Sequence, residues 1–188
     1  MHITGVLLAA GAGVRFGGGK LSASLAGSTV GRLACANLVA AFADPIAVIR
    51  PGDEALGQEL IAQGARVTVC PAAAGGMGES LSHGMRTALQ DRPDAIVVAL
   101  ADMPWVSPQT YLAVRLALER GEPLVVPRVG KARGHPVGFG REHFAALLQL
   151  KGDAGARGII EKAKRIAWLD VDDPGVLRDV DTRADLED

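Results

Sequence analysis

The sequence is poor in aromatic side chains, in cysteine and in excess charge of either sign. Only 4% of its 188 residues are aromatic, whereas 48% are hydrophobic and 24 are glycine. This composition suits an α/β chain with many tight turns better than an all-β chain. The formal net charge of −1 argues against a general nucleic-acid binder, which normally carries a strong basic excess. Any anion that the protein binds must therefore be held locally.

The two cysteines, Cys35 and Cys70, form neither a CxxC pair nor a zinc-binding pattern. Each lies in an apolar segment, so we expect two buried thiols in a reducing compartment.

No stretch approaches the roughly 20 uninterrupted apolar residues of a membrane span. The apolar run at 6–13 lacks a basic segment before it and is followed at once by cations, which disfavours a signal peptide. We expect a single cytoplasmic domain over residues 1–188, with no membrane or nucleic-acid partner.

The chain opens with a strand that runs into a glycine loop. Residues 3–8 are mostly apolar, as in a strand covered on both faces. Residues 9–20 follow with the sequence AAGAGVRFGGGK. Its glycines allow positive φ and a close approach to a ligand, leaving N–H groups free to point at an anion. The only charges in the loop are the cations Arg15 and Lys20. Together these features favour a polyphosphate.

The spacing of this loop excludes two common phosphate-binding patterns. The dinucleotide motif GxGxxG would need glycine at Phe16 and an acid about 20 residues further on. A Walker A loop would need glycine at Val14 and a hydroxyl at Leu21. On composition alone, a flexible glycine turn with solvated charges remains the alternative.

Beyond the loop, segments whose apolar residues are spaced as in strands alternate with segments whose apolar residues are spaced as in helices. This βαβαβ order predicts a three-layer Rossmann-like α/β fold, with a mostly parallel central sheet, helices on both faces and ligands at the carboxyl ends of the strands. Strands are expected at 46–49, 66–70, 95–101, 124–127, 166–171 and 176–180. Helices are expected at 29–42, 53–63, from the loop 71–82 to about residue 90, and at 108–119, 141–150 and 153–163, the last with Asp153 as its N-cap.

Two segments in the first two-thirds of the chain carry candidate ligand-binding groups. The glycine-rich loop 71–82 offers free amides at a helix start together with Ser80 and Ser82, although an ordinary loop with a capping serine has the same pattern. Asp102 ends a buried strand, and Ser107 with its following proline already supplies the next helix cap. Asp102 is therefore left without a structural role, and we expect it to bind Mg²⁺.

The last third of the chain offers cations and further acids. Residues 128–139 include Arg133 and His135 in a basic flap, which could receive an anionic second substrate or simply be solvated. Asp181 either caps the final turn or provides a second metal ligand. The neighbouring acids, including Asp173, are expected to form a solvated bend.

Six short motifs resemble one nucleotidyltransferase family. They are LAAGxxxRFGxxK at 8–20, GMxxSL at 76–81, ADxP at 101–104, RGHPV at 133–137, GDxGAR at 152–157 and DVDT at 179–182. In these places and in this order the chain resembles the molybdenum cofactor guanylyl- and cytidylyltransferases, the MobA-like NTP transferases. LAAG, with RGHP and GDxGAR, favours the cytidylyl branch. The segment 21–25, LSASL, departs from the leucines and proline usual in the family.

The resemblance implies an enzyme that transfers CMP from CTP to the terminal phosphate of a molybdopterin-type cofactor, with Mg²⁺ as cofactor and a molybdoenzyme or its chaperone as a protein partner. It assigns catalysis to Arg15, Lys20 and Asp102, and the metal to Asp102 and Asp181. The implied nucleotide contacts are Leu8, Ala9, Ala10, Gly11, Gly13, Arg15, Lys20, Gly78 and Ser80, and the implied acceptor contacts are Arg133, His135, Asp153 and Arg157.

The chain has no GxSxG, HExxH or Cys/His pattern, so the residues indicate no activated side-chain nucleophile. A phosphate that attacks a nucleoside triphosphate needs none, because alignment and charge neutralisation suffice. The alternatives are a transferase that uses GTP, one that uses a sugar or polyol phosphate as acceptor, and a non-catalytic chaperone for the cofactor. A nicotinamide-dependent oxidoreductase is a more distant alternative.

Overall fold

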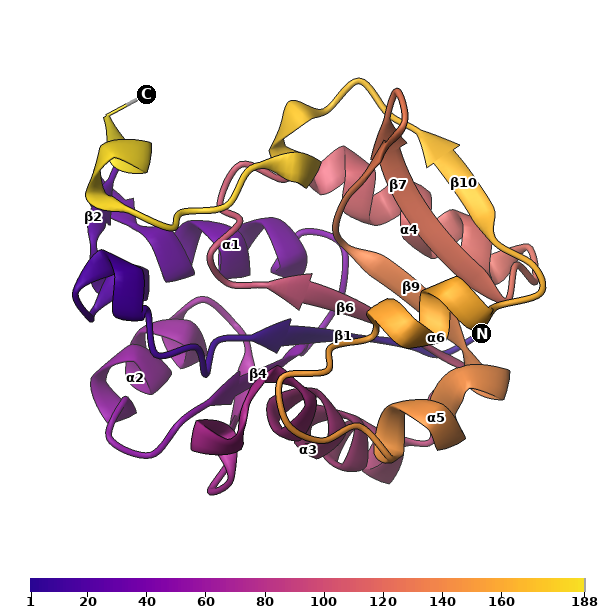
Figure 1. The fold of residues 1–188 in the computed structure, drawn as a ribbon, viewed down its shortest axis with the longest axis horizontal. Helices are drawn as coiled ribbons and strands as arrows, with labels where there is room; N and C mark the ends of the chain where they lie inside the picture. The colour runs from indigo at the N-terminus through magenta and orange to yellow at the C-terminus, as the bar shows by residue number, and fades with distance from the viewer. Residues whose placement is uncertain (188) are drawn as a thin grey trace.

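The computed structural model describes residues 1–187 and contains a central eight-stranded sheet (Figure 1). The strands are β1 (Ile3–Leu8), β4 (Ile46–Ile49), β5 (Arg66–Val69), β6 (Ala95–Leu100), β7 (Leu124–Val129), β8 (Ala132–Arg133), β9 (Val137–Gly140) and β10 (Ala167–Asp170), and β2 (Ser24–Leu25) with β3 (Ser28–Thr29) forms a separate hairpin. The helices are α1 (Val30–Val39), α2 (Glu54–Ala62), α3 (Met77–Ala88), α4 (Pro108–Glu119), α5 (Phe144–Leu148) and α6 (Arg157–Lys162).

The sheet has the order β10-β7-β9-β6-β1-β4-β5, with β8 paired to β7. β1 is parallel to β4 and β6, β4 to β5, and β7 to β10, whereas β9 is antiparallel to both of its neighbours. Leu8 aligns with Val48 on one side and with Leu100 on the other. The loops that follow β1, β4 and β6 therefore meet at one edge of the sheet. The predicted fold class, a mostly parallel sheet with helices on both faces, is confirmed.

Side-chain alternation along the strands produces two apolar layers. Leu7 and Val97 face α1, α2 and α4, whereas Val6 and Ile96 face α3, α5 and α6. All four side chains are fully buried. Each stabilises the fold by about 1.5–3 kcal/mol relative to an exposed position. The sheet is thus fixed on both faces, and only its edges and loops remain for binding. Within residues 1–187, no helix is both long and apolar enough to cross a bilayer.

The helix predicted at 153–163 is present as α6, but its predicted N-cap, Asp153, is wrong, because α6 begins at Arg157 and its N-cap is Ala156. The preceding loop packs backbone to backbone against the start of α3. The amide of Gly78 donates to the carbonyl of Gly152 at 2.8 Å, and a Cβ on Gly78 would lie 2.8 Å from backbone atoms of Lys151. This contact holds the loop, which turns at Gly152, against α3 and leaves Asp153 at a cavity.

The predicted strand at 176–180 is also wrong, since Pro174–Leu177 forms a 3₁₀ turn. The chain then crosses the sheet edge toward the glycine loop, as the yellow segment of Figure 1 shows. Asp173, predicted to be solvated, anchors the start of this segment by accepting from the Ser107 amide at 2.9 Å and from the Thr110 hydroxyl at 2.6 Å. The Val180 amide donates to the carbonyl of Asp102 at 2.8 Å. These contacts bring Asp181 to the end of β6.

Candidate functional site

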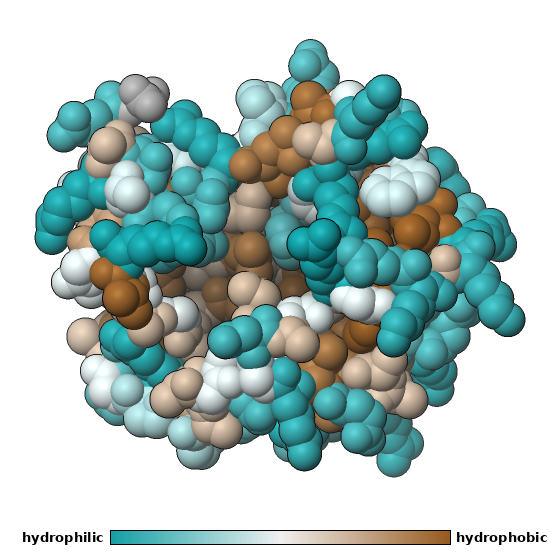
Figure 2. Space-filling view, in the orientation of Figure 1, coloured by the Kyte–Doolittle hydropathy of each residue, from teal (hydrophilic) through white to brown (hydrophobic). Residues whose placement is uncertain are grey.

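A cavity of about 560 Å³ lies at the carboxyl ends of β1, β4 and β6. Figure 2 shows the middle of this face hollowed, with hydrophobic residues on its floor and hydrophilic residues around it. Of the residues predicted to bind a ligand, those lining the cavity are Leu8, Ala10, Gly11, Lys20, Ser80, Asp102 and Asp153. The strand ends and the glycine loop therefore share one space.

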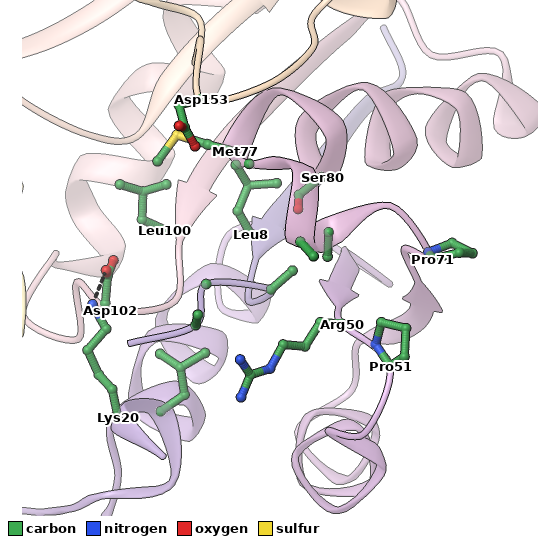
Figure 3. A pocket seen from close by; sticks show the side chains of 17 residues that line it. Leu8, Lys20, Arg50, Pro51, Pro71, Met77, Ser80, Leu100, Asp102 and Asp153 are labelled. Carbon is green, nitrogen blue, oxygen red and sulfur yellow. Dashed lines mark hydrogen bonds and ion pairs between the residues drawn. The ribbon is translucent and has the colours of Figure 1, made fainter. Parts of the chain in front are cut away.

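The glycine loop presents Lys20 to this cavity. Gly13, Gly17, Gly18 and Gly19 all have φ between 59° and 90°, which lets the loop turn tightly before Lys20. The Lys20 side chain is only 11% exposed, and its Nζ donates to Asp102 Oδ2 at 2.7 Å. In Figure 3 this pair forms one side of the cavity.

Two acids distant in sequence converge on the Lys20 ammonium. Asp102 follows β6, and Asp181 Oδ1 lies 3.8 Å from the same Nζ. Arg15, which is 79% exposed, donates to Asp181 Oδ2 at 2.6 Å. Burial, followed by the charges of Asp102 and Asp181, raises the pKa of Asp179. The cluster therefore combines three carboxyl groups with two cations.

The residues present fit a divalent cation. Asp102 and Asp181 already share one cationic group, the Lys20 ammonium, and carboxylate oxygens are ligands that Mg²⁺ prefers. Among residues 1–187, no group of three or more His, Cys, Asp or Glu side chains is arranged to hold a metal by itself. Phosphate and water oxygens would complete the coordination of such an ion, as is usual for Mg²⁺ bound with a nucleotide.

A second cavity, of about 270 Å³, adjoins the first and shares Leu8, Met77 and Leu100 with it. Its walls bring together Arg133, His135 and Arg157, three of the four predicted acceptor residues, with an apolar lining of Val98, Val126, Val137 and Phe139. The fourth predicted acceptor residue, Asp153, lines the larger cavity.

Glu161 links the two arginines of the second cavity. It accepts from Arg157 Nε at 2.7 Å and lies 3.8 Å from a terminal nitrogen of Arg133. The hydrogen bond from Arg157 lowers the pKa of Glu161, with a smaller charge contribution from both arginines. The carboxylate therefore holds a cation of β8 and a cation of α6 at the same cavity.

His135 is neutral in the folded protein near pH 7. Burial lowers its pKa to about 4, although the nearby charge of Asp102 and the carbonyl of Val98 act in the opposite direction. Its Nδ1 is buried and has no hydrogen-bond partner among the described residues. Because His135 lines the second cavity, its neutral ring lies beside any ligand held there.

Several other predicted residues lie outside the cavity linings. Ala9 is 1% exposed and belongs to the core, and Gly78 packs beneath the loop before α6. A Cβ on Gly13 would lie 3.2 Å from Lys20 Cβ, so this glycine makes room for the lysine. Ser82 is fully buried and donates to the carbonyl of Glu79.

The residues that sequence reasoning missed include Arg50, Met77 and Leu100, which line the cavities, and Glu161, which contacts two lining arginines. Two of them had a usable signal. Met77 belongs to the GMxxSL segment, and Arg50 directly follows a parallel strand at the edge where ligands bind. Glu161 had none for its contact with Arg133, because β8 is distant from it in sequence.

Comparisons with known proteins agree with this geometry. The profile of the MobA-like NTP transferase domain matches residues 5–166. The purine catabolism protein PucB of Bacillus subtilis (strain 168) is 32% identical over 191 residues, which cover 96% of this chain and 92% of that protein. Rv0371c from Mycobacterium tuberculosis H37Rv is 28% identical with a TM-score of 0.84, over 100% of this chain and 98% of that chain.

A second crystal structure of Rv0371c was solved in complex with manganese, and this chain superposes on it with a TM-score of 0.82 at 27% identity, over 100% of this chain and 99% of that one. The family match spans most of the chain and includes the glycine loop, Asp102 and the second cavity. The protein is a nucleotidyltransferase and belongs to the MobA-like NTP transferase family.

Proposed function

We propose that this protein transfers CMP from CTP to the terminal phosphate of a molybdopterin-type cofactor and releases pyrophosphate, with Mg²⁺ as its cofactor. The observation that carries the proposal is the junction of the two cavities at Leu8, Met77 and Leu100, with the Lys20–Asp102 pair in the wall of the larger one. A nucleotide in the larger cavity and an acceptor in the smaller one would meet at this junction.

On the nucleotide side, the amides of the glycine loop with Arg15 and Lys20 hold the triphosphate. Ala10, Gly11 and Ser80 line the rest of the larger cavity and contact the nucleoside. An oxygen of the acceptor phosphate attacks the α-phosphorus, the bond from this phosphorus to the oxygen bridging to the β-phosphate breaks, and pyrophosphate leaves with that electron pair. The protein contributes alignment and charge neutralisation.

Asp102 and Asp181 would hold the Mg²⁺, which would neutralise the charge that develops on the α-phosphate. Their convergence on the Lys20 ammonium supports this assignment. The crystal structure of Rv0371c with manganese supports a divalent cation in this family.

On the acceptor side, the second cavity combines a hydrophobic lining that includes Phe139 with Arg133 and Arg157. This combination suits a flat ring that carries a phosphate. His135 also lines this cavity, and its neutral state avoids a further charge beside the ring. Asp153 lies at the larger cavity, near Met77 in Figure 3. From there it would contact the acceptor at the junction.

The experiment is a pyrophosphate-release assay that pairs CTP, GTP or ATP with molybdopterin, a sugar phosphate or a polyol phosphate. We expect release with CTP and molybdopterin, only in the presence of Mg²⁺. Asp102→Asn should reduce turnover about 100-fold or more. Asp91→Asn, which alters an acid before β6 at the opposite sheet edge, is the matched control.

Other outcomes of this assay identify the alternatives. Release with GTP or with a sugar or polyol phosphate in place of CTP and molybdopterin would assign a different nucleotide or acceptor. A non-catalytic cofactor chaperone would bind molybdopterin without CTP or Mg²⁺ and release no pyrophosphate.

A further inference from the structure

Arg50 lies at the nucleotide cavity although no part of the proposed mechanism uses it. It directly follows β4, and the amide of Ala9 donates to the carbonyl of Val48 at 2.8 Å, so the chain at Arg50 runs beside the start of the glycine loop. Arg50 lines the large cavity and also a groove of about 120 Å³ between the glycine loop and the start of α2. In Figure 3 its guanidinium extends from beside Pro51 toward Lys20.

One side of the Arg50 guanidinium is held in place. Its Nε donates to Asp53 Oδ2 at 2.9 Å, and the two side chains are 35% and 23% exposed. Asp53 occupies the N-cap position of α2 but forms no side-chain cap, because its carboxylate binds Arg50 instead. Among the described residues, the two terminal nitrogens of Arg50 have no hydrogen-bond partner.

The neighbours of Arg50 in the groove indicate which part of a nucleotide it meets. The groove is lined by Gly11, Gly19 and Lys20 of the glycine loop, whereas Ser80 lies only in the large cavity. Lys20 and Arg50 are the cations of the groove and Asp53 its only acid. A forked guanidinium fixed through Nε offers two parallel donors, which match the oxygens of a phosphate.

We propose that Arg50 binds the distal phosphates of the nucleoside triphosphate, and the pyrophosphate after transfer, as a third cation beside Arg15 and Lys20. The inference rests on the proposed nucleotidyl transfer and names a further binding residue for that reaction. It explains why Asp53 is directed to Arg50 rather than to the amides of α2.

The test is calorimetric titration of CTP, CMP and pyrophosphate, each with Mg²⁺, into the wild-type protein and Arg50→Gln. We expect affinity for CTP and pyrophosphate to fall about 10- to 100-fold, as for a lost charge-assisted contact, and affinity for CMP to stay the same within about twofold. Arg66→Gln removes an arginine paired with Asp91, away from the cavities, and should change none of the three affinities.

Arg50→Lys provides a second, conservative variant, which keeps the charge but loses the fork. We expect the same pattern with a smaller loss, because a lysine offers a point charge in place of two parallel donors. Equal losses for CMP and CTP would overturn the inference by placing Arg50 at the base or ribose, as would unchanged affinities in both variants. If the wild-type protein itself binds no nucleotide and no pyrophosphate, the proposed function fails, and the inference with it.

Discussion

Replacing Lys20 by methionine tests whether the acids around it form a cation site. The Lys20 ammonium lies 2.7 Å from Asp102 and 3.8 Å from Asp181, and it is only 11% exposed. Methionine keeps an unbranched apolar side chain but removes the charge, so Asp102 loses its partner and Asp181 keeps only Arg15. Asp179, whose pKa burial and these two acids raise, adds to the repulsion.

The expected magnitude follows from the partial burial of the pair. Breaking a fully buried ion pair costs about 3–5 kcal/mol, and the 25% exposure of Asp102 reduces this, so we expect a loss of about 2 kcal/mol in the free energy of unfolding. For a chain of this length that loss lowers Tm by about 4–8 °C. A divalent cation at about ten times its Kd would restore about 1.4 kcal/mol, or about 3–6 °C.

The assay is thermal unfolding of the apoprotein with and without Mg²⁺. We expect Mg²⁺ to raise Tm more in Lys20→Met than in the wild-type protein, because the wild-type ammonium competes with the metal for the same carboxylates. Adding Asp102→Asn should abolish the Mg²⁺ effect, and Lys131→Met, at an exposed flap position, should behave as wild type. Equal Mg²⁺ shifts in wild type and Lys20→Met would refute the reasoning.

Three further predictions concern packing, pH and the acceptor side. Gly78→Ala should lower the unfolding free energy by about 1–3 kcal/mol in urea titrations, because the new Cβ would lie 2.8 Å from the backbone of the loop before α6; an unchanged midpoint would show that the loop can move. Between about pH 6.5 and 4 the unfolded chain holds a proton on His135 that the folded chain does not, so stability should fall by about 3 kcal/mol as the pH drops through this range. His135→Phe should flatten that part of the urea-midpoint profile, and overlapping profiles would contradict the assignment. Glu161→Gln should raise KM for the acceptor about twofold to fivefold with kcat unchanged, because the partner of Arg157 loses its negative charge, and a change in kcat alone would exclude this positioning role.

The parts of the fold that could be predicted from the sequence carry strong local signals. β1, β4 and α4 have the bounds that their apolar patterns predict. The Ser107 side chain caps α4 as expected, which leaves Asp102 outside that cap. Because parallel strands align their carboxyl ends, their order alone placed the glycine loop and Asp102 at the same edge.

The rest depends on contacts between segments distant in sequence. Asp153 has the local pattern of an N-cap, but the packing of Gly78 against the loop before α6 decides its position. The segment 176–180 has strand-like composition, yet contacts to Ser107 and Asp102 determine its path. The contact of Glu161 with Arg133, 28 residues earlier in the chain, is likewise invisible to a local pattern.

The central claim is that the glycine loop and two acids from distant segments form one cation-dependent nucleotide site. Calorimetric titration of CTP into the wild-type protein and Asp102→Asn, with and without Mg²⁺, tests it most directly. We expect CTP to bind the wild-type protein tightly only with Mg²⁺, and Asp102→Asn to lose this dependence. Failure to bind CTP, GTP or ATP, or equal binding with and without Mg²⁺, would contradict the claim.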